Sequence, residues 1–140
     1  MATLDEIVRQ ARSYVGTPYL HQGRTRHGLD CAGLLVVVAH DLGLYPGVDH
    51  RSYGLLNDGS VVMDMAREHF VPQREATPGL IGIFRSGGAS RHYGIFGDHP
   101  AGGLSLIHAF SKIRRVAEMR FDGFWEKRLV AVFSYKGVED

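Results

Sequence analysis

The chain has 140 residues, 44% of them hydrophobic, which suits a single domain (residues 1–140) whose core needs no disulfide or metal to form. Its 16 Lys and Arg nearly balance 15 Asp and Glu, so a net charge of +1 gives no reason to expect a nucleic acid partner. The single cysteine excludes an intramolecular disulfide. We expect no membrane span, because no stretch reaches about 18 uncharged apolar residues. We also expect synthesis in the cytoplasm without a signal peptide, because the acidic start lacks an apolar segment.

The first segment predicts an amphipathic helix followed by a loop. Thr3 and Glu6 have the spacing of a capping box, and the apolar residues after them recur at helical intervals until Gly16 and Pro18. Residues 18–29 show no periodicity and are rich in Gly, His and Arg, so we expect an irregular, solvated loop there.

Two further helices are predicted before residue 73. Asp30 is a good N-cap for residues 31–44, which are apolar nearly all round and therefore predict a helix that is covered on most sides. A third helix is predicted from a cap at Ser60 to the break at Pro72.

The second half of the sequence predicts strands, because short apolar or alternating runs follow one another with Gly, Ser, Asp and Pro between them. These runs are Leu80 to Phe84, His92 to Phe96, Leu104 to Phe110, Arg115 to Met119 and Leu129 to Tyr135, with a short helical turn at Asp122 to Lys127. Helices followed by strands indicate an α+β fold with N-terminal helices packed on a mostly antiparallel sheet of five to six strands.

Cys31 lies where the loop gives way to the second helix. A lone cysteine is more often a small buried hydrophobe than a reagent. At a helix start, however, the unsatisfied N–H groups and the macrodipole favour the thiolate and can stabilise an oxyanion. We therefore expect a thiol biased toward thiolate and acting as a nucleophile.

Two histidines lie on predicted strands at positions that share a face with apolar neighbours. His92 alternates in register with Gly94 and Phe96, and His108 does so with Leu106 and Phe110. If both faces pack on the second helix, the two rings lie side by side and point toward Cys31. A nucleophile, a base and a group that orients the base would then converge.

A zinc site is the main chemical alternative, since one cysteine and two histidines are acceptable ligands. The sequence has no H-E-x-x-H, no C-x-x-C and no carboxylate at ligand spacing, so we predict neither a metal nor any other cofactor.

Four segments carry a resemblance to a known family. Residues 16–19 (GTPY), 30–34 (DCAGL) and 91–96 (RHYGIF) are similar to the G-x-P-Y, D-C-x-G-L and H-x-G-I-aromatic motifs of the NlpC/P60 family. Residues 106–109 (LIHA) resemble its strand for the third catalytic residue. Members are papain-like cysteine peptidases that cleave peptide bonds of the bacterial cell wall. The short chain and its ending most resemble the subgroup of phage tails and gene transfer agents.

The resemblance implies Cys31 as nucleophile, His92 as general base and His108 as the residue that orients His92. It further implies that Tyr19 lines the site and helps to stabilise the oxyanion. It also implies that Asp30 caps the helix and faces the substrate's amino group.

His21 is assigned to the rim of the cleft, as a further substrate-binding residue. The chain departs from the family where many members have two glycines, since it reads Gln22-Gly23, and where many have Ser after the cysteine, since it has Ala32.

The function implied by the resemblance is hydrolysis of amide bonds in peptidoglycan stem peptides, of the D-Glu to diaminopimelate type. The implied partners are the stem peptide and phage tail or tail-tip proteins, with action in the particle tail or at the periplasmic cell wall. Two alternatives stay open, namely a catalytically idle docking protein that kept the fold, and another amidase or an acyltransferase on the same fold.

Overall fold

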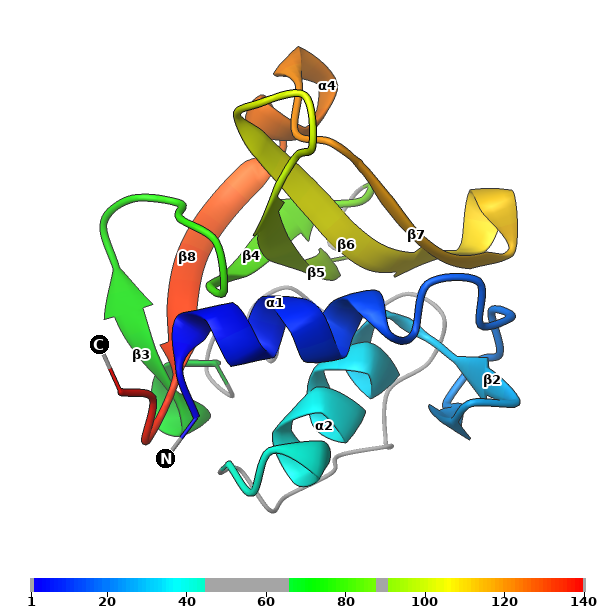
Figure 1. Ribbon diagram of the computed structural model, residues 1–140. Helices are drawn as coiled ribbons and strands as arrows, with labels where there is room; N and C mark the ends of the chain where they lie inside the picture. The colour runs from blue at the N-terminus through cyan, green and yellow to red at the C-terminus, as the bar shows by residue number, and fades with distance from the viewer. Residues whose placement is uncertain (1, 45–65, 88–90, 140) are drawn as a thin grey trace.

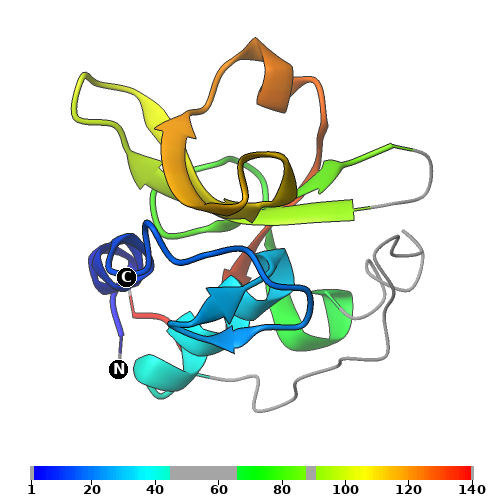
Figure 2. The same cartoon turned by 90° about the vertical axis from the view of Figure 1, so that its right-hand side faces the viewer.

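The computed structural model describes residues 2–44, 66–87 and 91–139. A curled sheet forms one layer, and helices α1 and α2 cover one of its sides (Figure 1). Turned by 90°, the molecule shows the sheet and the short helix α4 above and the two long helices below (Figure 2). The predicted α+β class is therefore confirmed.

Helix α1 (Leu4–Arg12) begins at the predicted capping box, with both halves formed. The Glu6 backbone N–H donates to Thr3 Oγ1 over 3.1 Å, and the Thr3 N–H donates to the Glu6 carboxylate. Near its other end, Arg12 makes a two-point contact with Glu118, at 2.9 and 2.8 Å, which ties the helix to the sheet.

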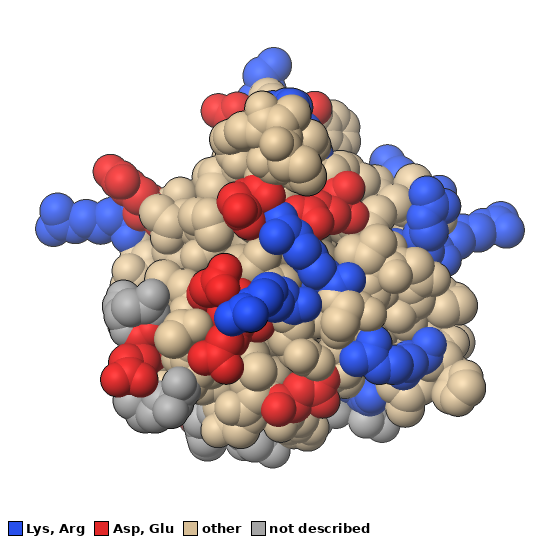
Figure 3. Space-filling view, viewed as in Figure 1, with Lys and Arg blue, Asp and Glu red and all other residues tan. Residues whose placement is uncertain are grey.

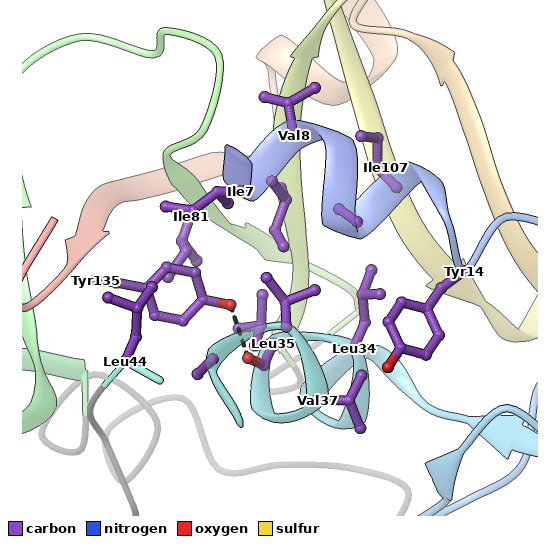
Figure 4. Close-up of a cluster of buried hydrophobic side chains, with 14 of the residues drawn as sticks. Ile7, Val8, Tyr14, Leu34, Leu35, Val37, Leu44, Ile81, Ile107 and Tyr135 are labelled. Carbon is purple, nitrogen blue, oxygen red and sulfur yellow. Dashed lines mark hydrogen bonds between the residues drawn. The ribbon is translucent and has the colours of Figure 1, made fainter. Parts of the chain in front are cut away.

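Helix α2 (Cys31–Asp41) is covered on most sides, as predicted from its composition. Its leucines and valines pack with Ile7 and Val8 of α1 and with strand residues such as Ile81 and Ile107 (Figure 4). The buried Tyr135 hydroxyl donates to the Leu35 carbonyl over 2.7 Å, so the polar end of this core residue is satisfied.

Six antiparallel strands form the main sheet, in the order β3-β8-β4-β5-β6-β7. They are β3 (Phe70–Gln73), β4 (Ile81–Arg85), β5 (Arg91–Asp98), β6 (Leu104–Phe110), β7 (Arg115–Arg120) and β8 (Leu129–Tyr135). A 3₁₀ turn η1 (Ser111–Ile113) joins β6 to β7, and α4 (Gly123–Glu126) joins β7 to β8. Strands β4 to β8 and the turn before β8 thus lie where the sequence predicts them, whereas β3 was not predicted as a strand.

The two faces of the sheet bury two different clusters. Ile95 and Ile107 belong to the cluster that includes both long helices, whereas Phe96 and Leu106 belong to a second cluster with Trp125. The expectation that the Phe96 face packs on α2 is therefore wrong. Strand alternation fixes which residues share a face but not which face meets the helices. Here the aliphatic face meets them, and the aromatic face closes under α4.

Two segments differ from the expected loop and helix. Residues 24–25 and 28–29 pair as a two-stranded ribbon, β1 (Arg24–Thr25) and β2 (Gly28–Leu29), inside the expected irregular loop. The third helix, predicted from 60 to 72, lies mostly outside the described residues, but its helical part ends at residue 69. Strand β3 follows at the sheet edge, where Pro72 needs no partner for the N–H that it lacks.

Charges of both signs are interleaved over the α1 side of the molecule (Figure 3). Pairs such as Arg9 with Asp5, at 2.9 Å, contribute to this pattern. In the described part of the chain, no helix is both long and apolar enough to cross a membrane.

Candidate active site

Helix α2 begins at Cys31 because Asp30 caps it. The Asp30 carboxylate accepts from the Gly33 N–H over 2.7 Å and from the Gln22 N–H over 2.8 Å, and Asp30 is only 2% exposed. One carboxylate thus fixes both the first turn of the helix and the loop before it.

Arg24 also belongs to this arrangement, contrary to its expected place on a solvated loop. Its Nη1 lies 3.0 Å from Asp30 Oδ1, and its side chain is 8% exposed. Gly33 permits the loop before the helix to approach the first turn of α2 closely, because a Cβ at this position would lie 2.2 Å from the Gly23 carbonyl oxygen. The Asp30 carboxylate therefore serves the protein's own loop, and its expected contact with a substrate amine stays a prediction.

The Cys31 side chain is partly buried at the start of α2. Burial and the charge of Asp30 raise the pKa of Cys31 to about 12, against the opposing effect of backbone N–H groups at Tyr93, Ala32 and Cys31 itself. Burial therefore acts against the expected bias toward thiolate, in the direction opposite to the effect of the helix terminus. The Tyr93 amide beside the sulfur places Cys31 against β5, at the residue that follows His92 in the chain.

Tyr19 and His21 lie close to this helix start. Burial, then the Cys31 and Asp30 charges, raise the pKa of the Tyr19 phenol to about 12, so the hydroxyl is a proton donor near the thiol at neutral pH. His21 Nδ1 lies 4.0 Å from Asp30 Oδ2 on the exposed side of the loop. Tyr19 is therefore near Cys31 and His21 is near Asp30, and their roles toward a substrate stay predictions.

The two histidines meet directly. His92 Nε2 lies 2.6 Å from His108 Nδ1, and both residues are buried. Gly94 makes room for this contact, since a Cβ at that position would lie 3.2 Å from His108 Cβ and 2.5 Å from Leu106 Cδ1. The predicted contact between the two imidazole rings is confirmed.

The model of the NlpC/P60 family matches residues 16–134. The chain belongs to this family. No curated protein matches it. Among solved structures, the NlpC/p60 domain of the peptidoglycan hydrolase SagA is similar, with 23% identity, a TM-score of 0.66, and coverage of 95% of this chain and 99% of that one.

Two structures of lower sequence identity also share the fold. NlpC2 of Trichomonas vaginalis has 19% identity and a TM-score of 0.71, covering 96% of this chain but 47% of that one. An N-acetylmuramoyl-L-alanine amidase of Bacteroides uniformis has 12% identity and a TM-score of 0.50, covering 93% and 96%. The chain thus spans less than half the length of the Trichomonas protein.

The spacing of two motif segments has a steric explanation in this chain. In the D-C-A-G segment, Gly33 admits the Gly23 carbonyl against the helix start, and in the H-Y-G segment, Gly94 admits His108 beside His92. A side chain at either glycine would separate the residues that the motif brings together.

Sequence reasoning missed the aromatic surroundings of the histidine pair. Trp125 lies 5.5 Å from His92 and 5.0 Å from His108 between ring centroids, and Phe110 stacks on His108 at 5.2 Å. Burial there lowers the pKa of His92 to about 4 and that of His108 to about 3. A tryptophan on a short turn before the last strand was visible in the sequence, but its partner was not.

In the part of the chain that the structure describes, no group of three or more His, Cys, Asp or Glu side chains has the arrangement of a metal site.

Proposed function

We propose that this NlpC/P60 protein is a cysteine peptidase that hydrolyses amide bonds in peptidoglycan stem peptides. The observation that carries the proposal is the His92–His108 contact beside the strand amide that faces the Cys31 sulfur. His92 uses Nε2 toward His108, which leaves Nδ1 as the nitrogen that accepts the thiol proton.

The proposed reaction starts from a neutral thiol and a neutral imidazole, since burial raises the pKa of Cys31 and lowers that of His92. Sγ attacks the amide carbonyl carbon while the thiol proton moves to His92 Nδ1. The C–N bond then breaks as His92 returns this proton to the leaving amine, which gives a thioester. Water hydrolyses the thioester, with His92 taking a proton from the water and giving it to the departing sulfur.

We propose that two groups stabilise the oxyanion that forms during attack. The backbone N–H groups at the start of α2 face the sulfur side of the site, and the Tyr19 hydroxyl stays protonated at neutral pH. Donors of this kind lower the barrier by stabilising the charge that develops on the carbonyl oxygen.

The direct experiment is mass spectrometry of purified sacculi that contain diaminopimelate, digested by the protein and by its Cys31→Ala and His92→Ala variants. We expect the C31A variant to release nothing above background and the H92A variant to lose about 10²- to 10⁴-fold in rate. His27→Ala is the control, since His27 is exposed and has no role in the proposed reaction. Equal release by wild type and C31A would refute the hydrolase and favour an idle docking protein.

The same spectra identify the bond. We propose cleavage between D-Glu and diaminopimelate, which leaves L-Ala-D-Glu on the muramyl residue. Release of the whole stem peptide would instead indicate an amidase, the activity named for the Bacteroides uniformis structure of similar fold. Transfer of the acyl group to an added amine would indicate an acyltransferase.

We further propose that the protein acts within a phage tail or gene transfer agent, at the periplasmic cell wall, and that tail proteins recruit it. Support comes from the resemblance of residues 18–22, and of Trp125, Lys127 and Arg128 before the last strand, to the subgroup of phage tails and gene transfer agents. This proposal predicts weak lysis when the free protein is added to cells from outside. Tight binding of the isolated protein to sacculi would contradict it.

A further inference from the structure

His108 has a buried ring nitrogen that the catalytic scheme leaves unexplained. In the described residues, its Nε2 is one of the few buried side-chain atoms without a hydrogen-bond partner, and the residue is 0% exposed. A buried polar atom without a partner is costly, so its surroundings decide whether it carries a proton or a lone pair.

The 2.6 Å contact with His92 allows two neutral arrangements. In the first, His92 Nε2–H donates to His108 Nδ1, so His108 carries its own proton on Nε2. In the second, His108 Nδ1–H donates to His92 Nε2, so His92 carries its proton on Nδ1 and His108 Nε2 has a lone pair. Only the first arrangement leaves His92 Nδ1 able to accept a proton from the thiol.

The aromatic side chains around His108 distinguish these arrangements. The Trp125 ring meets His108 edge to face, at 5.0 Å and an interplanar angle of 87°. Phe110 covers the flat side of the same imidazole at 5.2 Å and 20°. The face of an aromatic ring is electron-rich, so it attracts an N–H at its centre and repels a lone pair.

We propose that Trp125 is a positioning residue whose ring receives the Nε2–H of His108 and thereby holds the histidine pair in the arrangement that leaves His92 Nδ1 unprotonated. The catalytic meaning of that nitrogen rests on the proposed function. The protonation pattern itself does not depend on it.

Trp125 is held for this role by the short helix α4. Asp122 caps α4 by accepting from the Phe124 N–H over 3.1 Å, and Trp125 is 5% exposed. The ring also lies against Phe84 at 5.5 Å and Phe110 at 5.4 Å, so its position is fixed from two strands.

The test is the nitrogen NMR of the imidazole rings at pH 7, where both histidines are neutral and the two tautomers have distinct ¹⁵N shifts. We expect wild type to show protons on Nε2 of both His92 and His108. Trp125→Leu keeps an apolar side chain but removes the ring face, so it shifts this equilibrium by about two- to fivefold. Trp125→Phe keeps a ring face and restores most of the wild-type pattern.

Phe121→Leu is the matched control for disturbance of the aromatic cluster. Phe121 packs on Phe84 and Phe96 at 6.2 and 5.1 Å, within the same cluster as Trp125. We expect F121L to leave both tautomers unchanged. In sacculus digestion, W125L lowers kcat about as much as it depletes the active tautomer, with KM unchanged, and W125F rescues it.

A wild-type spectrum with the His108 proton on Nδ1 would overturn the proposal outright, without any variant. A W125L protein that folds and keeps the wild-type tautomers would overturn it equally. If the tautomers respond as expected but no protein releases fragments from sacculi, then the proposed function fails and the role of Trp125 stands.

Discussion

Neutralising Asp30 should weaken the fold and activate the thiol at the same time. The Asp30→Asn substitution keeps the size and one acceptor oxygen, and asparagine caps a helix about as well as aspartate. It removes the charge that faces Arg24 at 3.0 Å, although the Arg24 side chain is only 8% exposed. It also turns an amide N–H toward the Gln22 N–H, which now donates to Asp30 Oδ2.

The expected loss is about 3–5 kcal/mol of unfolding free energy, the usual cost of removing one partner of a buried ion pair. Arg24→Met is the matched control. It leaves Asp30 with its two backbone donors and should cost less, about 1–3 kcal/mol. The double variant removes both charges and leaves no unpaired buried charge, so it should be at least about as stable as D30N alone. Urea unfolding at pH 7 measures all three.

D30N should make the Cys31 thiol more reactive although it destabilises the fold. The Asp30 charge is one cause of the raised pKa of Cys31, so D30N should lower that pKa and speed alkylation by iodoacetamide under native conditions. R24M keeps the carboxylate and should not speed it. A D30N protein that loses less than about 1 kcal/mol, or whose loss simply adds to that of R24M, would refute the buried pair.

Three further predictions concern the histidines, the thiol and the glycine between the strands. Because burial lowers the pKa of His92 to about 4 and of His108 to about 3, the unfolded chain binds protons below pH 6.5 that the native state does not. Stability should therefore fall as pH decreases from 6.5 toward 4, by about 1.4 kcal/mol per pH unit for each histidine, and equal urea midpoints at pH 5 and 6.5 would contradict this. Alkylation of Cys31, with a pKa of about 12, should keep rising from pH 7 to 10, whereas a plateau there would indicate a stable thiolate–imidazolium pair. Gly94→Ala should cost about 1–3 kcal/mol by overpacking and reduce activity, while Gly123→Ala, where a Cβ meets nothing within 4 Å, should do neither.

Local sequence signals predicted the elements of this fold well. The capping box at Thr3 and the cap at Asp30 are both formed, because each needs only residues within one helical turn. The strands β4 to β8 lie where apolar runs are separated by turn residues. Signals of this kind do not depend on what the element packs against.

Predictions that depended on partners beyond one helical turn, or on the degree of burial, were less successful. Residues 70–73 form a strand only because β8 lies beside them, and no local pattern shows that pairing. Arg24 looked like a loop cation, but Asp30 draws it into the interior. The thiol pKa also depends on burial, which a helix start does not predict. In each case, an element distant in sequence or the degree of burial decided the outcome.

Two features of the site act on the histidine pair, namely the small Gly94 beside it and the aromatic side chains around it. In the H-Y-G segment, the small Gly94 leaves room for Leu106 and His108 on the neighbouring strand, and aromatic side chains cover the histidine pair. Excluding water keeps both rings neutral at rest, which makes His92 ready to accept a proton but a weak base. In the proposed mechanism, substrate attack therefore has to drive the transfer from sulfur to His92, and interactions with the developing oxyanion must supply what a preformed thiolate would otherwise contribute.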